Sequence, residues 1–262
     1  MTATVSPAAA ARTGSAAHGT PAAAHDDRAR LGALVAGVGY VALFVFAIAG
    51  NFGVVEQLVV DGDAAATTAN LEGSLGWARF GFVAFTVIFL ADLFVAWGLH
   101  LWFRRWNTDV SLLAAWSRVA YTVLLGVGLV HYAEALRLLG ATGAAGHDGR
   151  SDVEVAVADA MARFQDAWLI GLAVFGVHLV VLAILMLRHR AAPTAMGWLI
   201  GIAGTAYVAD TVAHIVLADY DRIATVALAI VAVPSMLGEG WLGLHLLRRS
   251  RTPHPSPKPQ AV

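Results

Sequence analysis

The chain has 262 residues, of which 58% are hydrophobic and only 13% are charged; soluble proteins have about 25% charged residues, so this composition excludes an ordinary soluble domain. A formal net charge of −1 excludes the concentrated basic surface of a nucleic-acid-binding protein, and the absence of cysteine excludes disulfides and thiolate metal sites. The composition therefore indicates an integral membrane protein whose partner is the lipid bilayer, with no nucleic acid bound.

Six apolar stretches lie between two low-complexity tails. We expect disordered tails over residues 1–30, rich in alanine and proline, and over the proline-rich residues 250–262. Each stretch is close to the ~20 residues that a helix needs to cross the hydrocarbon core, and lipid offers the backbone no hydrogen bonds, so the stretches are helices. We therefore predict an all-α transmembrane domain over 31–249, with spans at about 31–51, 80–103, 112–138, 166–187, 195–218 and 223–247.

The basic residues are unevenly divided between the two sides of this bundle. Eleven of the 17 lie on the N-terminal side, five lie on the other side, and Arg118 lies within a span. Because basic loops remain cytoplasmic, we expect a multi-pass protein of the inner (plasma) membrane with both termini in the cytoplasm. The excess of arginine over lysine and the abundant alanine are typical of a GC-rich bacterial genome.

The first outer loop, residues 52–78, contains a short helical motif. The segment from Ala64 to Leu71 follows an aspartate that can accept hydrogen bonds from the first free backbone N–H groups of a helix. We therefore expect a helix there. Three polar residues share one face of it: Asp63, Thr67 and Asn70.

Five short segments are informative because of the order in which they follow one another along the chain. They are Asp63-Ala64-Ala65-Ala66-Thr67-Thr68-Ala69-Asn70, Ala78-Arg79-Phe80-Gly81, Ser117-Arg118-Val119, Pro193 with Gly197, and Gly238-Glu239. In order and spacing they resemble a bacterial multi-pass membrane family, catalogued as domain of unknown function 4386, over about 31–249. The sequence departs from the family at Thr194, where arginine is frequent, and at His245, where an aromatic residue is usual. The resemblance implies a six-span bacterial membrane protein and implies no activity.

Ionisable residues within the spans are the candidates for function. A charge in hydrocarbon costs at least ~2.5–3.5 kcal/mol, so such residues face the interior of a bundle and find partners. The charged residues and histidines in the spans are Asp92, Arg118, His131, Glu134, His178, Asp210, His214 and Glu239.

Two pairs in the outer halves of the third and fifth spans each share a helix face because of their spacing of three or four residues. Imidazoles and carboxylates from facing helices suit a metal site, a proton relay, or simple hydrogen bonds between helices, and all three readings stay open. The pairs are His131 with Glu134 and Asp210 with His214, which would also be the metal ligands; Tyr207, Asp92 and His178 complete the ligand or proton-relay candidates.

Arg118 and Glu239 lie at similar depth near the inner ends of their spans. An ion pair between them would neutralise two costly charges, which makes them candidates for a structural ion pair. Alternatively, Arg118 binds an anionic head group or substrate, or it extends to the cytoplasmic interface. The helical wheel places Arg118 on a different face from His131 and Glu134, so the two groups share a pocket only if that helix is central.

No cofactor is predicted. A b-type haem needs two histidines at one depth on facing helices, and His131 and His178 differ in depth. Common signatures of soluble enzymes are absent. Our leading hypothesis is a non-enzymatic membrane protein with an outward-facing polar cavity for a proton or a small polar or amphiphilic ligand. The alternatives are an intramembrane metal- or haem-dependent enzyme and a structural or partner-binding scaffold; the sequence specifies no oligomeric state.

Overall fold

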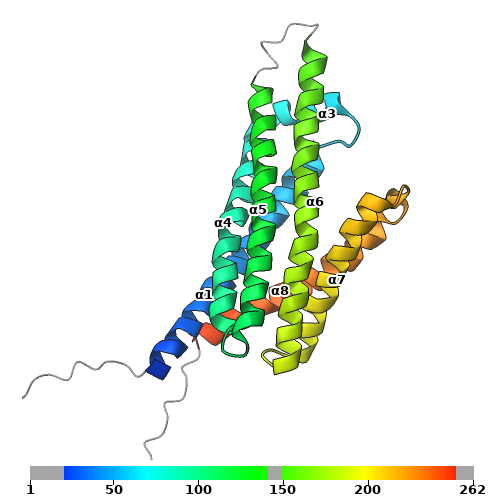
Figure 1. Ribbon diagram of the computed structural model, residues 1–262. Coiled ribbons are helices and arrows are strands. Elements are labelled where there is room, and N and C mark those ends of the chain that lie inside the picture. Colours follow the sequence, from blue (N-terminus) through cyan, green and yellow to red (C-terminus); the bar gives the residue numbers. More distant parts are fainter. Residues whose placement is uncertain (1–20, 141–148, 252–262) are drawn as a thin grey trace, which may run out of the picture.

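The computed structural model describes residues 21–140 and 149–251. Within these ranges every regular element is a helix and no strand occurs, which confirms the all-α prediction (Figure 1). Most of the two expected tails, and residues 141–148 between the third and fourth spans, lie outside the described residues.

Six helices of the described chain are long and apolar enough to cross a membrane, as predicted. The first consists of α1 (Pro21–Ala47), which continues through a π-helical segment, η1 (Ile48–Val55), into the single turn α2 (Glu56–Leu58). The others are α4 (Leu75–Phe103), α5 (Thr108–Leu139), α6 (Arg150–His189), α7 (Thr194–Val216) and α8 (Ala224–Arg251). Two short helices, α3 (Ala64–Gly73) and the 3-10 turn η2 (Tyr220–Arg222), lie in the connections.

Two helices begin earlier than the sequence suggested. Helix α1 begins at Pro21, inside the segment expected to be a tail, and α6 begins at Arg150 rather than at about residue 166. The early part of α6 is too polar to read as a membrane span, but it is amphipathic. Its buried residues follow the three- and four-residue spacing of one helix face: Val157, Ala160, Met161 and Phe164.

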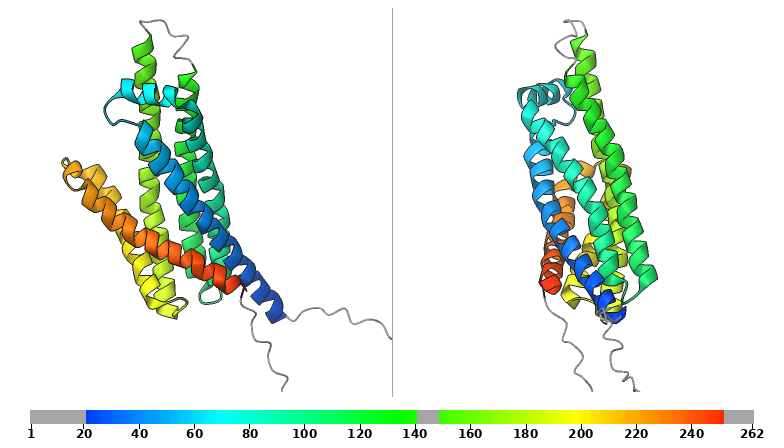
Figure 2. Two further views of the ribbon diagram at one scale, coloured as in Figure 1. Left: turned by 180° about the vertical axis from the view of Figure 1, so that it is seen from behind. Right: turned by 90° about the vertical axis from the view of Figure 1, so that its left-hand side faces the viewer.

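The six long helices form a ring in which each packs against its neighbours in the order α1, α4, α5, α6, α7, α8 and back to α1. Residues 21 and 251 lie at one end with the α4–α5 and α6–α7 turns, and we call this the terminal end (Figure 1). The opposite end, with α3 and η2, is the loop end. Helices α1 and α8 meet near the terminal end and diverge toward the loop end, where the α7–α8 hairpin leans away from α6 (Figure 2).

Glycines allow two pairs of these helices to approach closely. A Cβ atom added to Gly204 of α7 would lie 2.6 Å from the carbonyl oxygen of Gly176 in α6, and one on Gly98 of α4 would lie 2.7 Å from that of Gly32 in α1. Small residues at such crossings are typical of membrane helices, which associate by close packing rather than by the hydrophobic effect.

The expected helix in the first outer loop is present as α3 and is capped as predicted, with the Asp63 carboxylate accepting from the Ala66 N–H at 2.8 Å. The other two polar residues of that face bind the preceding segment: the Thr67 hydroxyl donates to the carbonyl of Val60 at 3.1 Å, and the Asn70 amide donates to that of Leu58 at 3.3 Å. The three residues therefore fold the loop back on itself.

Candidate functional site

An arginine buried in the middle of the bundle organises the site. The Arg118 guanidinium on α5 meets Asp92 on α4, with Nη2 and Nε at 2.5 and 2.7 Å from the same carboxylate oxygen, Oδ1. Both side chains are 1% exposed. The two unlike charges thus neutralise each other where hydrocarbon would penalise either one alone.

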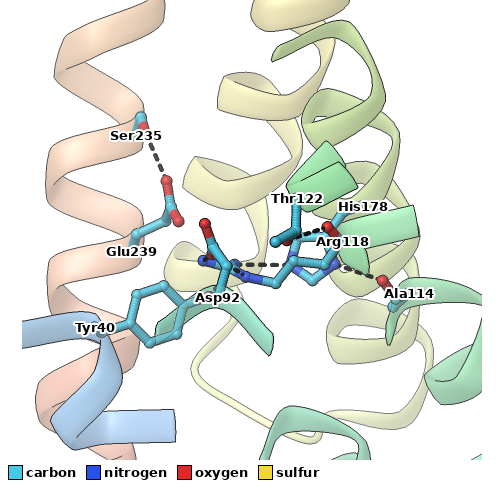
Figure 3. A network of polar contacts seen from close by, with 8 residues as sticks. All are labelled: Tyr40, Asp92, Ala114, Arg118, Thr122, His178, Ser235 and Glu239. Atoms are coloured by element: carbon cyan, nitrogen blue, oxygen red, sulfur yellow. Dashed lines mark hydrogen bonds and ion pairs between the residues drawn. The ribbon is translucent and has the colours of Figure 1, made fainter. Parts of the chain in front are cut away.

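A histidine from α6 holds the other side of the guanidinium (Figure 3). The His178 Nδ1 lies 2.8 Å from the carbonyl oxygen of Ala114, and its Nε2 lies 3.2 Å from Arg118 Nη1. A carbonyl only accepts hydrogen bonds, so Nδ1 carries the proton and Nε2 accepts from Arg118. His178 is therefore a neutral imidazole that orients the arginine.

Aromatic rings complete the surroundings of Arg118. Its Cζ lies 5.2 Å from the centre of the Tyr40 ring on α1 and 5.1 Å from that of Phe175 on α6, within reach of cation–π attraction. The Tyr40 hydroxyl also accepts a hydrogen bond from Arg118 Nη1 at 3.4 Å. Four helices, α1, α4, α5 and α6, thus meet at one cation.

A second carboxylate approaches the same region from α8 (Figure 3). Glu239 is 7% exposed, and its Oε1 accepts a hydrogen bond from the Ser235 hydroxyl at 2.7 Å. Because the serine proton points to Glu239, the Tyr207 hydroxyl, 3.3 Å from Ser235 Oγ, is the donor of the next bond. A chain of hydrogen bonds thus runs from Tyr207 on α7 through Ser235 to Glu239.

The structure pairs Arg118 with Asp92 and not with Glu239, which corrects the partner expected from depth. Helix α4 packs directly beside α5, whereas α8 packs against α1 and α7 on the other side of the ring. Arg118 is fully buried, so it does not extend to the membrane surface either. Arg118 and Glu239 have similar depths along their spans, but depth carries no information on which helices are neighbours.

A cavity of about 350 Å³ lies over this network. Its floor is polar and includes Tyr40, Asp92, Arg118, Tyr207, Ser235 and Glu239. Its walls are largely apolar and come from α1, α6 and α8, with Phe44, Trp168, Phe175 and Val231 among them. Along both α1 and α8 the lining residues extend from the floor toward the loop end, ending at Asn51 and Phe52 on one side and at Leu228 on the other.

The outer candidates are not brought together with one another. His131 and Glu134 contact each other at 3.4 Å on α5, are 29% and 40% exposed, and do not line the cavity. The other pair lies on α7, and α6 stands between these two helices (Figure 1). Within residues 21–140 and 149–251, no three histidines or carboxylates are grouped closely enough to hold a metal ion. The four residues therefore do not form a shared metal site, which was one of the three readings of the sequence.

Asp210 and His214 instead bind the connection between α7 and α8. The Tyr220 hydroxyl donates to Asp210 at 2.7 Å, and the rings of His214 and Tyr220 lie 4.4 Å apart. Partial burial and the hydrogen bond to Asp210 raise the pKa of Tyr220 to about 12, so the phenol stays neutral and keeps donating. Asp210 also lines the cavity, near its loop-end edge.

Three residues of the site escaped the sequence analysis because they are uncharged: Tyr40, Phe175 and Ser235. Two of them carried a usable signal. A tyrosine in the middle of a span needs a partner for its hydroxyl, and Ser235 stands four residues before Glu239, a spacing that places the two side chains together on a helix.

Taken together, a ring of six apolar helices around a buried ion pair and a cavity defines a multi-pass helical membrane protein with an internal polar site. Residues 35–250 match the model of a family described as Domain of unknown function (DUF4386), and the chain belongs to this family. No curated protein and no solved structure matches the chain.

Proposed function

We propose that the protein binds a small amphiphilic molecule in the central cavity, with the polar group on the floor and the apolar part against the walls. The observation that carries this proposal is the two-part lining: charged and hydroxyl groups gather on the floor, and the walls are largely aromatic and aliphatic, with Asn51 and Asp210 at the loop-end edge. Small-molecule sites are typically apolar pockets with a few converging polar groups, of about 300–1,000 Å³, and this cavity has about 350 Å³.

The bundle offers the molecule a route from the loop end. Helices α1 and α8 diverge in that direction (Figure 2). Residues that line the cavity lie along both of them. At the terminal end the same helices are in close contact, because a Cβ atom on Gly243 of α8 would lie 2.8 Å from the Cβ of Tyr40. With both termini in the cytoplasm, as the arginine distribution predicts, the cavity would open toward the outside.

The absence of cysteine from the chain allows a direct test by thiol labelling. In α8, Ala232 lines the cavity, whereas the adjacent Val233 points away from the bundle and is 55% exposed on its surface. We expect Ala232→Cys in lipid nanodiscs to react with N-ethylmaleimide and octan-1-ol to slow that reaction in a saturable way. We expect Val233→Cys to react slowly, because lipid covers it.

A third variant controls for effects of the alcohol on the chemistry. Asp219→Cys lies in the exposed α7–α8 connection, and octan-1-ol should leave its labelling rate unchanged. If octan-1-ol slows the labelling of Asp219→Cys as much as that of Ala232→Cys, or protects neither of them, the cavity is not a binding site for amphiphiles.

A further inference from the structure

We propose that the ligand of this cavity is a monocation, an organic ammonium with an apolar tail, and that Glu239 is the anion it binds. This inference rests on the proposed function, because it names the charge of the amphiphile that the cavity holds. The geometry points to it through the balance of charges on the lining.

The lining carries more carboxylates than cations. Asp92, Asp210 and Glu239 line the cavity, and Arg118 is the one arginine or lysine among the lining residues. Both Arg118 Nε and Nη2 bind Oδ1 of Asp92, so the positive charge is already matched. The lining therefore keeps an excess of negative charge for a ligand to balance.

Glu239 is the buried carboxylate that contributes to this excess of negative charge. Only Ser235, a neutral donor, binds its carboxylate, through Oε1, and no side-chain cation of the described chain lies within 4.0 Å of it. The side chain is more than nine-tenths buried, yet it lines the cavity. A carboxylate placed in this way requires either a proton or a cation beside it, and the cavity has room for the cation.

The remaining features of the floor also favour a cation over an anion. An ammonium group beside Glu239 would share the cavity with the aromatic rings of Tyr40, Phe44 and Tyr207, and aromatic rings attract cations. An anion, in contrast, would meet Glu239 and Asp210. Of its five N–H groups, Arg118 already directs most to Asp92, His178 and Tyr40 and offers little to a bound anion.

A proton and the ligand cation then compete for the same carboxylate. When Glu239 is protonated in the empty cavity, binding of one cation displaces that proton, and acid therefore weakens cation binding. The titratable and charged groups that share the cavity lining with Glu239 are Tyr40 of α1, Asp92 of α4, Arg118 and Tyr121 of α5, and Tyr207 and Asp210 of α7. His178 of α6 does not line the cavity and contacts Arg118.

The test uses the Ala232→Cys protein with two probes of fixed and opposite charge, octyltrimethylammonium and octyl sulfate. We expect the cation to protect the thiol at a concentration about tenfold lower than the anion, as a favourable ion pair implies. Glu239→Gln should abolish this preference while octan-1-ol still protects, which shows that the cavity is intact. The matched control is Glu134→Gln, which removes a carboxylate outside the cavity and should leave the preference unchanged.

Lowering the pH provides a second measurement that needs no substitution at Glu239. Protection by octyltrimethylammonium, relative to octan-1-ol at the same pH, should decline in acid. If octan-1-ol protects but the two charged probes protect equally in the Ala232→Cys protein, the ligand is not a cation, although the cavity still binds amphiphiles. If none of the three protects, the proposed function itself fails.

Discussion

Arg118 illustrates how a single cation can fix the positions of four membrane helices. Its guanidinium contacts Asp92 of α4 through Nε and Nη2, and it contacts His178 of α6 and Tyr40 of α1 through Nη1. Hydrocarbon offers no alternative partner to any of these side chains. The network therefore specifies one rotational setting of each helix, since turning any of the four away would leave a buried polar group without a partner.

The ion pair makes a prediction about stability. Arg118→Gln removes the cation and leaves Asp92 as an uncompensated buried charge, which costs about 3–5 kcal/mol in comparable pairs. The double variant Arg118→Gln with Asp92→Asn should recover a substantial part of that loss, because neither charge then remains. Reversible unfolding in detergent, followed by circular dichroism, measures both.

An exposed pair provides the comparison. Arg163 and Asp159 lie 3.6 Å apart and are 53% and 59% exposed, so Arg163→Gln should change stability by at most ~1 kcal/mol. A double variant no more stable than Arg118→Gln alone would show that the loss comes from the missing arginine contacts rather than from the charge of Asp92.

The sequence identified residues that the structure places at or beside the cavity floor, but it could not assign their partners. Asp92, Arg118, His178 and Glu239 stood out because charge and imidazole are costly in lipid, and all four occupy or border the cavity floor. The neighbour relations among helices depend on the packing of whole faces, which a sequence pattern does not reveal. Arg118 was therefore matched with Glu239 by depth, although Asp92 is adjacent.

Local sequence signals also located most of the helices but not every part of them. Apolar length located six spans and a capping aspartate located α3, because both signals are local. The sequence places the polar beginning of α6 in a loop, because an amphipathic helix lacks the uninterrupted run of apolar residues that marks a span. Yet this segment packs against α3, and the Thr68 hydroxyl donates to the carbonyl of Glu154 at 3.4 Å.

The close crossing of α6 and α7 predicts how a substitution at Gly204 changes stability. A methyl group on Gly204 would meet the backbone of α6 at 2.6 Å, and backbone atoms cannot move aside as a flexible side chain can. We expect Gly204→Ala to separate α6 from α7 and to cost about 1–3 kcal/mol of stability, as overpacking does elsewhere. The thermal midpoint of the purified protein, followed by circular dichroism, should fall accordingly.

Gly76 in α4 is the matched control for that measurement. A Cβ atom there meets nothing within 4 Å, and alanine favours a helix over glycine by up to ~1 kcal/mol. Gly76→Ala should therefore be neutral or stabilising. Equal destabilisation by both substitutions would mean that the contact between Gly176 and Gly204 does not limit the approach of the two helices.

Across the whole molecule, the ring is closed at one end and spread at the other. At the terminal end α8 packs against α1, where a Cβ atom on Gly37 would lie 2.6 Å from Leu247 Cγ. Toward the loop end the π-helical segment η1 contributes Asn51 and Phe52 to the cavity edge, and π segments are frequent at functional sites. We therefore expect a ligand held over Arg118 and Glu239 to enter from the loop end.

The side of the membrane that the loop end faces follows from the distribution of charge. Arginines concentrate at the terminal end, which carries Arg28, Arg30, Arg104, Arg105, Arg188, Arg190, Arg248, Arg249 and Arg251, whereas the loop end carries Arg79, Arg137, Arg150, Arg163 and Arg222. Because positively charged loops resist translocation, we expect the terminal end in the cytoplasm and the cavity edge outside. An even number of spans is consistent with both chain ends lying on one side.

Two cysteine variants test this orientation in spheroplasts. Asp219→Cys lies in the exposed connection at the loop end, and Thr194→Cys lies at the exposed first residue of α7 at the terminal end. A membrane-impermeant maleimide should label Asp219→Cys in intact spheroplasts and Thr194→Cys only after permeabilisation, while the cysteine-free parent chain stays unlabelled in both conditions. The reverse pattern would place the cavity edge in the cytoplasm, and the amphiphile would then enter from within the cell.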